Sequence, residues 1–169
     1  MSEESTPFGT IRQLPDGSFE GTLQRVYEGH DRAALWRMLT EPAAFAQWIA
    51  PGTIELRVGG AVQIDFQDSG TAIASTVLAL EPERLLAYSW SSPGEPERPL
   101  HWRLDDMPGG STRLTLTVHT PAGEDAAKAC AGFEGHLDML AGALEGVPIK
   151  FPFQRFLDAR AAYKQQLGA

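Results

Sequence analysis

Short runs of alternating apolar and polar residues occupy the middle of the chain. Residues 54–58 and 62–66 alternate in this way on either side of Gly59 and Gly60, which is the pattern of a β-hairpin. Similar apolar runs, each closed by glycine, proline or acidic turn residues, predict strands over 19–28, 71–80, 85–90, 100–104 and 114–118. Strands joined by such short turns pair antiparallel. The pattern therefore predicts one antiparallel sheet of about six or seven strands.

The last third of the chain changes to a helical period. Over residues 126–145 the apolar side chains fall on one continuous stripe, made by Cys130, Phe133, Leu137, Leu140, Ala141 and Leu144. Gly146 and Pro148 end this helix. A helix of about 20 residues is about 30 Å long. It is the only predicted element large enough to cover one face of the sheet.

Two shorter helices are predicted between the first and second strands. Asp31 caps the first of them, and Pro42 lies in the first turn of the second. The elements thus define an α+β fold. The expected organisation is a flexible leader over residues 1–17, one domain over residues 18–146 and a helical extension over residues 147–169.

A curved sheet wrapped around one long helix leaves a gap between the two, which is a natural place for a ligand cavity. Aromatic and aliphatic side chains from both walls, with one histidine, are expected to line it. These candidate ligand-binding residues are Phe45, Trp48, Trp90, Trp102, Phe133, His136, Leu137 and Leu140. The mouth of the cavity is expected near the second short helix and the loop over residues 91–99. The alternative interpretation of the same residues is core packing, since aromatic side chains bury large areas.

Candidate catalytic or metal-binding groups do not converge in the sequence. His136 flanks the apolar stripe and is the one histidine expected at the cavity. Glu134 and Asp138 lie four residues apart beside the stripe and are expected on a solvated face. Cys130 is expected to be a small core residue, with no second cysteine for an internal disulfide. No nucleophile elbow, phosphate loop or cluster with zinc-ligand spacing occurs, so the sequence predicts no catalytic residue, no metal ion and no cofactor.

The charge of the chain limits its partners. Among 169 residues, 14 lysines and arginines stand against 22 aspartates and glutamates, which gives a net charge of -8. This balance, without any basic tract, argues against binding to nucleic acid or to anionic membranes. No run approaches the roughly 20 apolar residues of a transmembrane helix, and residues 1–15 lack the pattern of a signal peptide. The expected location is the cytoplasm.

Five segments, taken in their order along the chain, resemble the START-like, or SRPBCC, helix-grip superfamily. Within it they are similar to the family named after the activator of the heat-shock-protein-90 ATPase. The segments are ALWRMLTEPAAFAQWIAPG (34–52), LRVGGAVQIDF (56–66), LEPERLLAYSW (80–90), STRLTLTVHT (111–120) and GFEGHLDMLAGALEG (132–146). The resemblance covers about residues 23–146. It implies a sheet curved around a long C-terminal helix, with Trp48 at the floor of the cavity entrance, and it supplies no catalytic motif.

The resemblance, with no catalytic set in the sequence, favours binding or carriage of a small apolar ligand such as a fatty acid, an aromatic metabolite or a polyketide. Because the superfamily also holds enzymes, the first alternative is a cyclase, dehydratase or hydrolase that uses His136 or an inward hydroxyl. The second is a chaperone-interacting module, as the family name implies. The sequence does not support a chaperone partner, because it shows no counterpart of the N-terminal chaperone-binding domain of the eukaryotic activators. The expected partner is a small apolar molecule, and a homodimer is left open.

Overall fold

The computed structural model describes residues 8–66 and 71–168. Its strands are β1 (Thr10–Gln13), β2 (Phe19–Tyr27), β3 (Gly52–Ile54), β4 (Ala61–Phe66), β5 (Thr71–Glu81), β6 (Leu85–Ser89), β7 (Pro99–Met107) and β8 (Ser111–Thr120). Its α-helices are α1 (Arg32–Thr40), α2 (Pro42–Phe45), α3 (Ala126–Leu144) and α4 (Phe153–Gln166). The strands form one sheet in the order β1-β2-β8-β7-β6-β5-β4-β3, and all neighbouring pairs are antiparallel.

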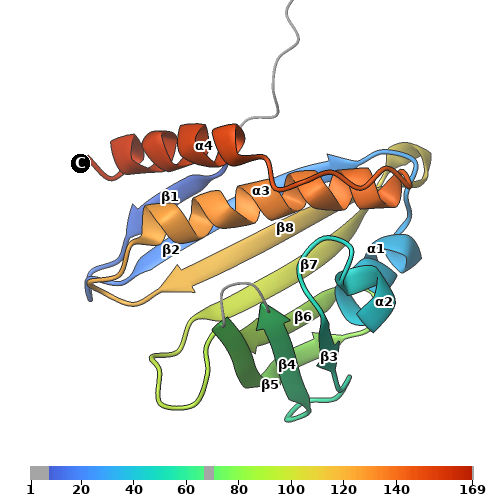
Figure 1. The fold of residues 1–169 in the computed structure, drawn as a ribbon, viewed down its shortest axis with the longest axis horizontal. Helices are drawn as coiled ribbons and strands as arrows, with labels where there is room; N and C mark the ends of the chain where they lie inside the picture. The colour runs from blue at the N-terminus through green and yellow to red at the C-terminus, as the bar shows by residue number, and fades with distance from the viewer. Residues whose placement is uncertain (1–7, 67–70, 169) are drawn as a thin grey trace, which may run out of the picture.

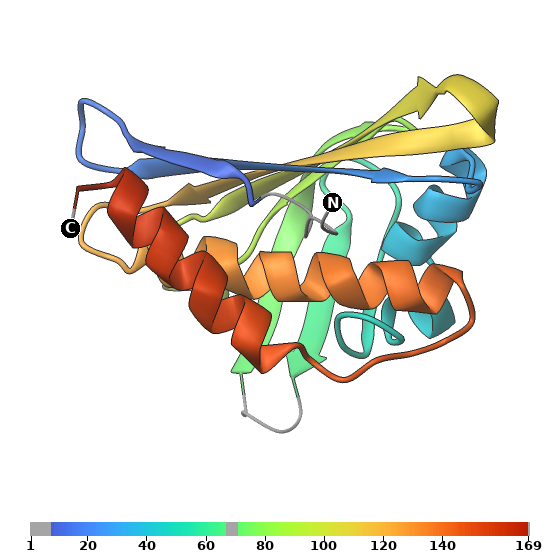
Figure 2. The same ribbon diagram turned by 90° about the horizontal axis from the view of Figure 1, so that it is seen from above.

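Two helices cover one side of this curved sheet (Figure 1). Helix α3 runs across the concave face, and α4 lies beside α3 near β1 and β2. Seen from above, α1 and α2 lie near the C-terminal end of α3 (Figure 2). The predicted helix-grip arrangement, with a long C-terminal helix and two short helices after the first long strand, is confirmed.

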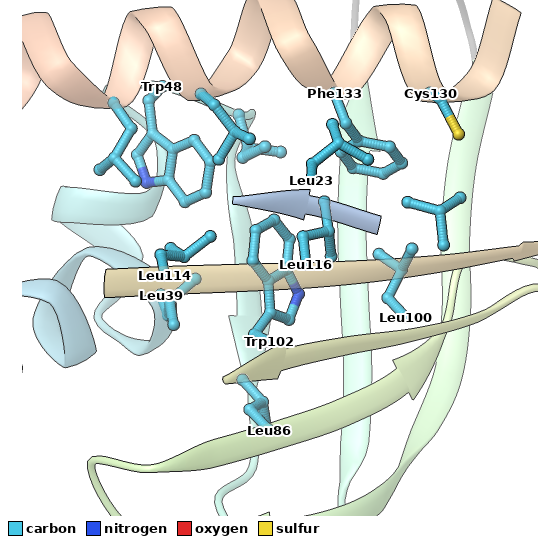
Figure 3. Close-up of a cluster of buried hydrophobic side chains, with 14 of the residues drawn as sticks. Leu23, Leu39, Trp48, Leu86, Leu100, Trp102, Leu114, Leu116, Cys130 and Phe133 are labelled. Carbon is cyan, nitrogen blue, oxygen red and sulfur yellow. The ribbon is translucent and has the colours of Figure 1, made fainter. Parts of the chain in front are cut away.

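The core fills the space between α3 and the concave face of the sheet. Figure 3 shows Trp102 and Leu116 rising from the strands toward Trp48 and Phe133 beneath α3. The largest fully buried side chains are Trp48, Trp102, Tyr88, Tyr163, Leu23, Leu35, Leu39, Ile64, Leu86, Leu100, Leu104 and Leu114. Full burial of one such apolar side chain contributes about 1.5–3 kcal/mol. The gap that the sequence places between helix and sheet is therefore largely occupied by side chains.

The sheet has eight strands rather than six or seven, and one additional strand lies in the segment expected to be a flexible leader. Strand β1 pairs with β2, and Ile11 is buried in the core. Helix α4 also holds this strand, because the Ile11 N–H donates to Gln166 Oε1 at 2.9 Å and Gln166 Nε2 donates to the Gly9 carbonyl at 3.0 Å. Those partners lie far away in the sequence, so no local pattern marks the strand. Residues 1–7 of the expected leader lie outside the described residues.

The prediction of a strand over residues 54–58 is wrong for every residue after Ile54. Strand β3 ends at Ile54, and Leu56 and Val58 are 47% and 64% exposed. The chain turns back here, with the Gly60 N–H donating to the Arg57 carbonyl at 2.8 Å. A Cβ atom on Gly60 would lie only 2.3 Å from the Glu55 carbonyl oxygen, so glycine is what permits this close turn. The alternation continues into the loop, but the backbone hydrogen bonds of a strand do not.

Candidate functional site

A pocket of about 340 Å³ opens between the N-terminal half of α3, the first turns of α4 and the ends of β4 and β6. Its lining residues are Phe66, Trp90, Asp125, Lys128, Ala129, Gly132, Phe133, His136 and Phe156. A wider hollow of about 490 Å³ lies over β3, β4 and β5, but no aromatic side chain lines it. Apolar, aromatic walls with few polar groups are typical of small-molecule sites, so the pocket beside α3 is the better candidate.

Aromatic rings from four different segments form the walls of this pocket. Trp90 stands in the middle, with its ring centroid 5.8 Å from that of Phe66 and 5.2 Å from that of Phe133. Both pairs meet edge to face, at interplanar angles of 70° and 69°, which is a favoured aromatic geometry. Phe156 of α4 adds the fourth ring. The mutual contacts of Phe66, Trp90 and Phe133 hold three of the walls in place without a ligand.

His136 brings one imidazole to these apolar walls. Its Nδ1 lies 2.7 Å from the backbone carbonyl oxygen of Trp48. Because a carbonyl can only accept, Nδ1 carries the hydrogen, and in the neutral ring Nε2 is an acceptor. Burial lowers the pKa of His136, and the hydrogen bond to Trp48 opposes that shift only in part. His136 is therefore a neutral imidazole of fixed tautomer near pH 7.

Charged groups are confined to the start of α3, at the rim of the pocket. Asp125 caps this helix by accepting the Lys128 N–H at 3.0 Å, and it also pairs with Arg160 of α4. Burial alone would raise the pKa of Asp125, but the Lys128 N–H and the Arg160 guanidinium together lower it. The Lys128 side chain is exposed and forms no ion pair within the described part of the chain. The rim therefore presents one ammonium group whose charge no carboxylate neutralises.

A buried ion network fixes α4 against α3. Arg25 of β2 donates to Glu134 Oε1 and to Asp138 Oδ1, each at 2.7 Å. Glu134 Oε2 accepts from the Tyr163 hydroxyl of α4 and from the Gly9 N–H, the latter at 2.8 Å. The side chain of Glu134 is 1% exposed. The solvated face expected for Glu134 and Asp138 is therefore wrong. Partners from β2 and α4 supply the hydrogen bonds that the buried Glu134 carboxylate needs, and the Asp138 side chain is only 19% exposed.

This network also positions one wall of the pocket. Arg155 of α4 donates from Nε to Asp138 Oδ2 at 3.0 Å, and Phe156 follows it directly. The segment that leads into α4 packs closely on α3, where a Cβ on Gly135 would lie 2.5 Å from the Phe151 ring. Helix α4 is therefore a fixed part of the site, held at both Asp138 and Glu134.

The structure divides the eight predicted ligand-binding residues into two groups. Trp90, Phe133 and His136 line the pocket. The other five, which are Phe45, Trp48, Trp102, Leu137 and Leu140, are buried in the core. Both core indoles have hydrogen-bond acceptors, since Trp48 Nε1 donates to the Met38 carbonyl at 2.8 Å and Trp102 Nε1 to the Tyr88 hydroxyl at 3.3 Å. The pocket lining includes no residue of α2, but it includes Trp90, which directly precedes the loop over residues 91–99.

Six of the nine residues that line the pocket were not among the candidates from the sequence, namely Phe66, Asp125, Lys128, Ala129, Gly132 and Phe156. Phe66 has the apolar parity of its strand, which marks it as inward but not as a pocket wall. Phe156 reaches the pocket because α4 folds back over α3. Gly132 leaves the wall open on the α3 side, since a Cβ there would meet no atom within 4 Å. A missing side chain on a helix gives no local signal of the space beside it.

Two further findings concern the described residues as a whole. No group of three or more histidine, cysteine, aspartate or glutamate side chains in residues 8–66 and 71–168 is placed to hold a metal ion. In the same part of the chain, no helix has the length and apolar character needed to cross a membrane.

Comparison with known families gives one match over most of the domain. The family described as activator of Hsp90 ATPase homolog 1-like protein matches residues 30–145. Among curated proteins, no sequence matches significantly.

Solved structures share the fold along nearly the whole chain. The crystal structure of CalU16 from Micromonospora echinospora is 22% identical with a TM-score of 0.75, over 95% of this chain and 96% of that one. A protein from Bordetella parapertussis, encoded by gene BPP1335, is 26% identical with a TM-score of 0.69, over 99% and 96% of the two chains. DynU16, a protein of the dynemicin biosynthetic locus, is 28% identical with a TM-score of 0.66, over 79% of this chain and 49% of that one. Together these structures place the chain in the helix-grip fold.

Proposed function

The chain belongs to the family of activator of Hsp90 ATPase homolog 1-like proteins, and from that premise we propose that it binds a small apolar molecule in the pocket between α3 and α4. The observation that carries the proposal is the pocket wall, in which Phe66, Trp90, Phe133 and Phe156 surround a volume of about 340 Å³. Small-molecule pockets usually measure about 300–1,000 Å³. The volume therefore suits a ligand of two or three rings or a short chain.

The arrangement of the pocket supports binding more than it supports chemistry. Its rings come from β4, α3, α4 and the residue that follows β6, and the pocket brings one imidazole, that of His136, to them. The charged side chains stand at the rim, where Asp125 already accepts from the backbone N–H of Lys128 and pairs with the Arg160 side chain. Such walls bury apolar surface, which favours binding by roughly 25 cal/mol for each Å² removed from water. The likeness to DynU16, which comes from a biosynthetic locus, is consistent with a small organic ligand.

Gly132 offers a direct test of this proposal. Replacing Gly132 with phenylalanine puts a ring into the pocket from α3, and the open space around Gly132 lets the side chain enter without a clash at Cβ. The uncharged dye N-phenyl-1-naphthylamine should bind the natural protein with affinity on the order of micromolar, and Gly132→Phe should weaken that binding at least about tenfold. Dye fluorescence and the quenching of tryptophan emission both report the binding.

Gly132→Ala is the matched control for this experiment. It removes the same glycine but adds one methyl group, and alanine favours a helix over glycine by about 1 kcal/mol. We expect it to raise the free energy of unfolding and to leave most of the dye binding intact. Equal dye affinity in the natural protein and in a folded Gly132→Phe variant would show that the dye binds elsewhere and would refute the proposal.

A further inference from the structure

His136 is held in the pocket by one of its two ring nitrogens. Its Nδ1–H donates to the Trp48 carbonyl oxygen at 2.7 Å, and the Trp48 indole is itself fixed by its bond to Met38. The ring also meets two phenyl rings, with centroids 6.5 Å away at Phe66 and 5.4 Å away at Phe151. The orientation of the imidazole is therefore set by the protein before any ligand arrives.

The other nitrogen of His136 has no hydrogen-bond partner among the described residues. Within residues 8–66 and 71–168, Nε2 makes no hydrogen bond. The fully buried side-chain nitrogens there that lack a partner are Arg113 Nε and Arg160 Nε, so Nε2 is not fully buried. It is therefore accessible from the pocket that His136 lines. When an apolar ligand takes the place of water at an acceptor and offers no donor, the acceptor loses a hydrogen bond and the ligand binds more weakly. A ligand without a donor group therefore binds more weakly in this pocket, whereas a ligand with an N–H or O–H at this point replaces the hydrogen bond that Nε2 made to water.

The position of Lys128 distinguishes a ligand that carries a carboxylate from one that carries a hydroxyl group. Lys128 lies at the rim, eight residues before His136 and so about 12 Å away along the helix. A carboxylate would be drawn to the ammonium group at the rim, because two acceptors, the carboxylate and Nε2, repel each other. A hydroxyl group can donate to Nε2 inside the pocket, where the neighbouring walls are aromatic rings that stack on or meet the edge of a planar ligand.

We infer that the ligand is a planar aromatic compound with a hydroxyl group that donates to His136 Nε2. This inference rests on the proposed function, because it names the chemical class that the same pocket prefers. His136 is then the specificity-determining residue, while Phe66, Trp90, Phe133 and Phe156 supply affinity for any apolar ring of suitable size. A phenol or naphthol is the simplest member of the class.

The test compares two probes that differ only in the donor. 1-Naphthol and 1-methoxynaphthalene carry the same ring system and an oxygen at the same position, but only 1-naphthol can donate a hydrogen bond. In an isothermal titration at pH 7.5, we expect 1-naphthol to bind the natural protein about three- to tenfold more tightly than 1-methoxynaphthalene.

His136→Asn is the matched variant for this comparison. The asparagine Nδ2 takes the place of Nδ1 along the side chain and can still donate to the Trp48 carbonyl, whereas no atom takes the place of Nε2. We expect this variant to bind the two probes equally, because neither probe meets an acceptor at the place of Nε2. A preference for 1-naphthol that survives in His136→Asn would overturn the inference, because the hydroxyl would then donate elsewhere.

The outcomes also separate this inference from the proposed function. Equal, measurable binding of both probes to the natural protein would refute the role of His136 and leave the apolar pocket supported. Binding of neither probe would count against the pocket itself. Should His136→Asn fail to fold, the nitrogen NMR signal of Nε2 in the natural protein gives a second readout. Because 1-methoxynaphthalene removes water from Nε2 without donating to it, that signal should shift differently with the two probes, and equal shifts would contradict the inference.

Discussion

Replacing Arg25 with methionine should lower the free energy of unfolding by about 3–5 kcal/mol, because it leaves a buried carboxylate without its cation. Arg25 joins β2 to α3 through Glu134 and Asp138, and the side chains of Arg25 and Glu134 are 7% and 1% exposed. Methionine keeps much of the length and packing of the side chain, so the loss reports mainly the missing charge and hydrogen bonds. Urea unfolding followed by circular dichroism measures it.

Arg12→Met is the control for that experiment. Arg12 also pairs with a glutamate across neighbouring strands, but its side chain is 70% exposed, and an exposed ion pair contributes about 0–1 kcal/mol. The two variants remove the same group from the same kind of pair and differ in burial. If Arg25→Met cost no more than Arg12→Met, the buried network would not be what holds α4 and β1 to the domain.

Replacing Trp48 with alanine should also lower the free energy of unfolding by about 3–5 kcal/mol, because it opens a large cavity in the core. Trp48 is 0% exposed and packs edge to face against Phe45 and Trp102, with ring centroids 5.8 and 5.7 Å away. The backbone carbonyl that accepts from His136 stays in place. Dye binding measured on the folded fraction should therefore change little.

Trp90→Ala is expected to affect dye binding more than stability, the reverse of Trp48→Ala. Trp90 is half-buried and lines the pocket, so its loss should weaken dye binding and cost less stability than the loss of Trp48. The pair of variants distinguishes a core tryptophan from a pocket tryptophan in one protein. A Trp48→Ala variant that is as stable as the natural protein and loses the dye would show that Trp48 is a wall of the pocket.

Local patterns in the sequence were sufficient to predict the long strands and the long helix. The apolar alternation in β7 and β8 is buried as its period predicts. The stripe of α3 is buried at Cys130, Phe133, Leu137 and Leu140, whereas Ala141 near the end of the helix is exposed. Strand β2 is harder to interpret because Arg25 lies on its inward face, where an apolar residue is the usual expectation. Strand β1, with Ile11 as its one buried residue, exists through pairing with β2 and contacts from α4.

The pocket could be predicted only in part, for a different reason. An aromatic residue on an inward face can fill the core or line a cavity, and its sequence position does not distinguish Trp48 from Trp90. The distinction depends on what packs opposite, and here that is α4, whose place is fixed by Glu134 and Tyr163. The role of Glu134 itself was missed because its partners in β2 and α4 are more than 25 residues away.

The most direct test of the pocket follows the four tryptophan indole N–H signals in a proton–nitrogen NMR spectrum while N-phenyl-1-naphthylamine is added. Single tryptophan-to-phenylalanine variants assign the signals of Trp36, Trp48, Trp90 and Trp102. Because Trp90 alone of the four lines the pocket, its signal should show the largest shift, and Gly132→Phe should abolish that shift. A Trp90 signal that stays still at saturating dye, while the signal of Trp48 or Trp36 moves, would contradict the account.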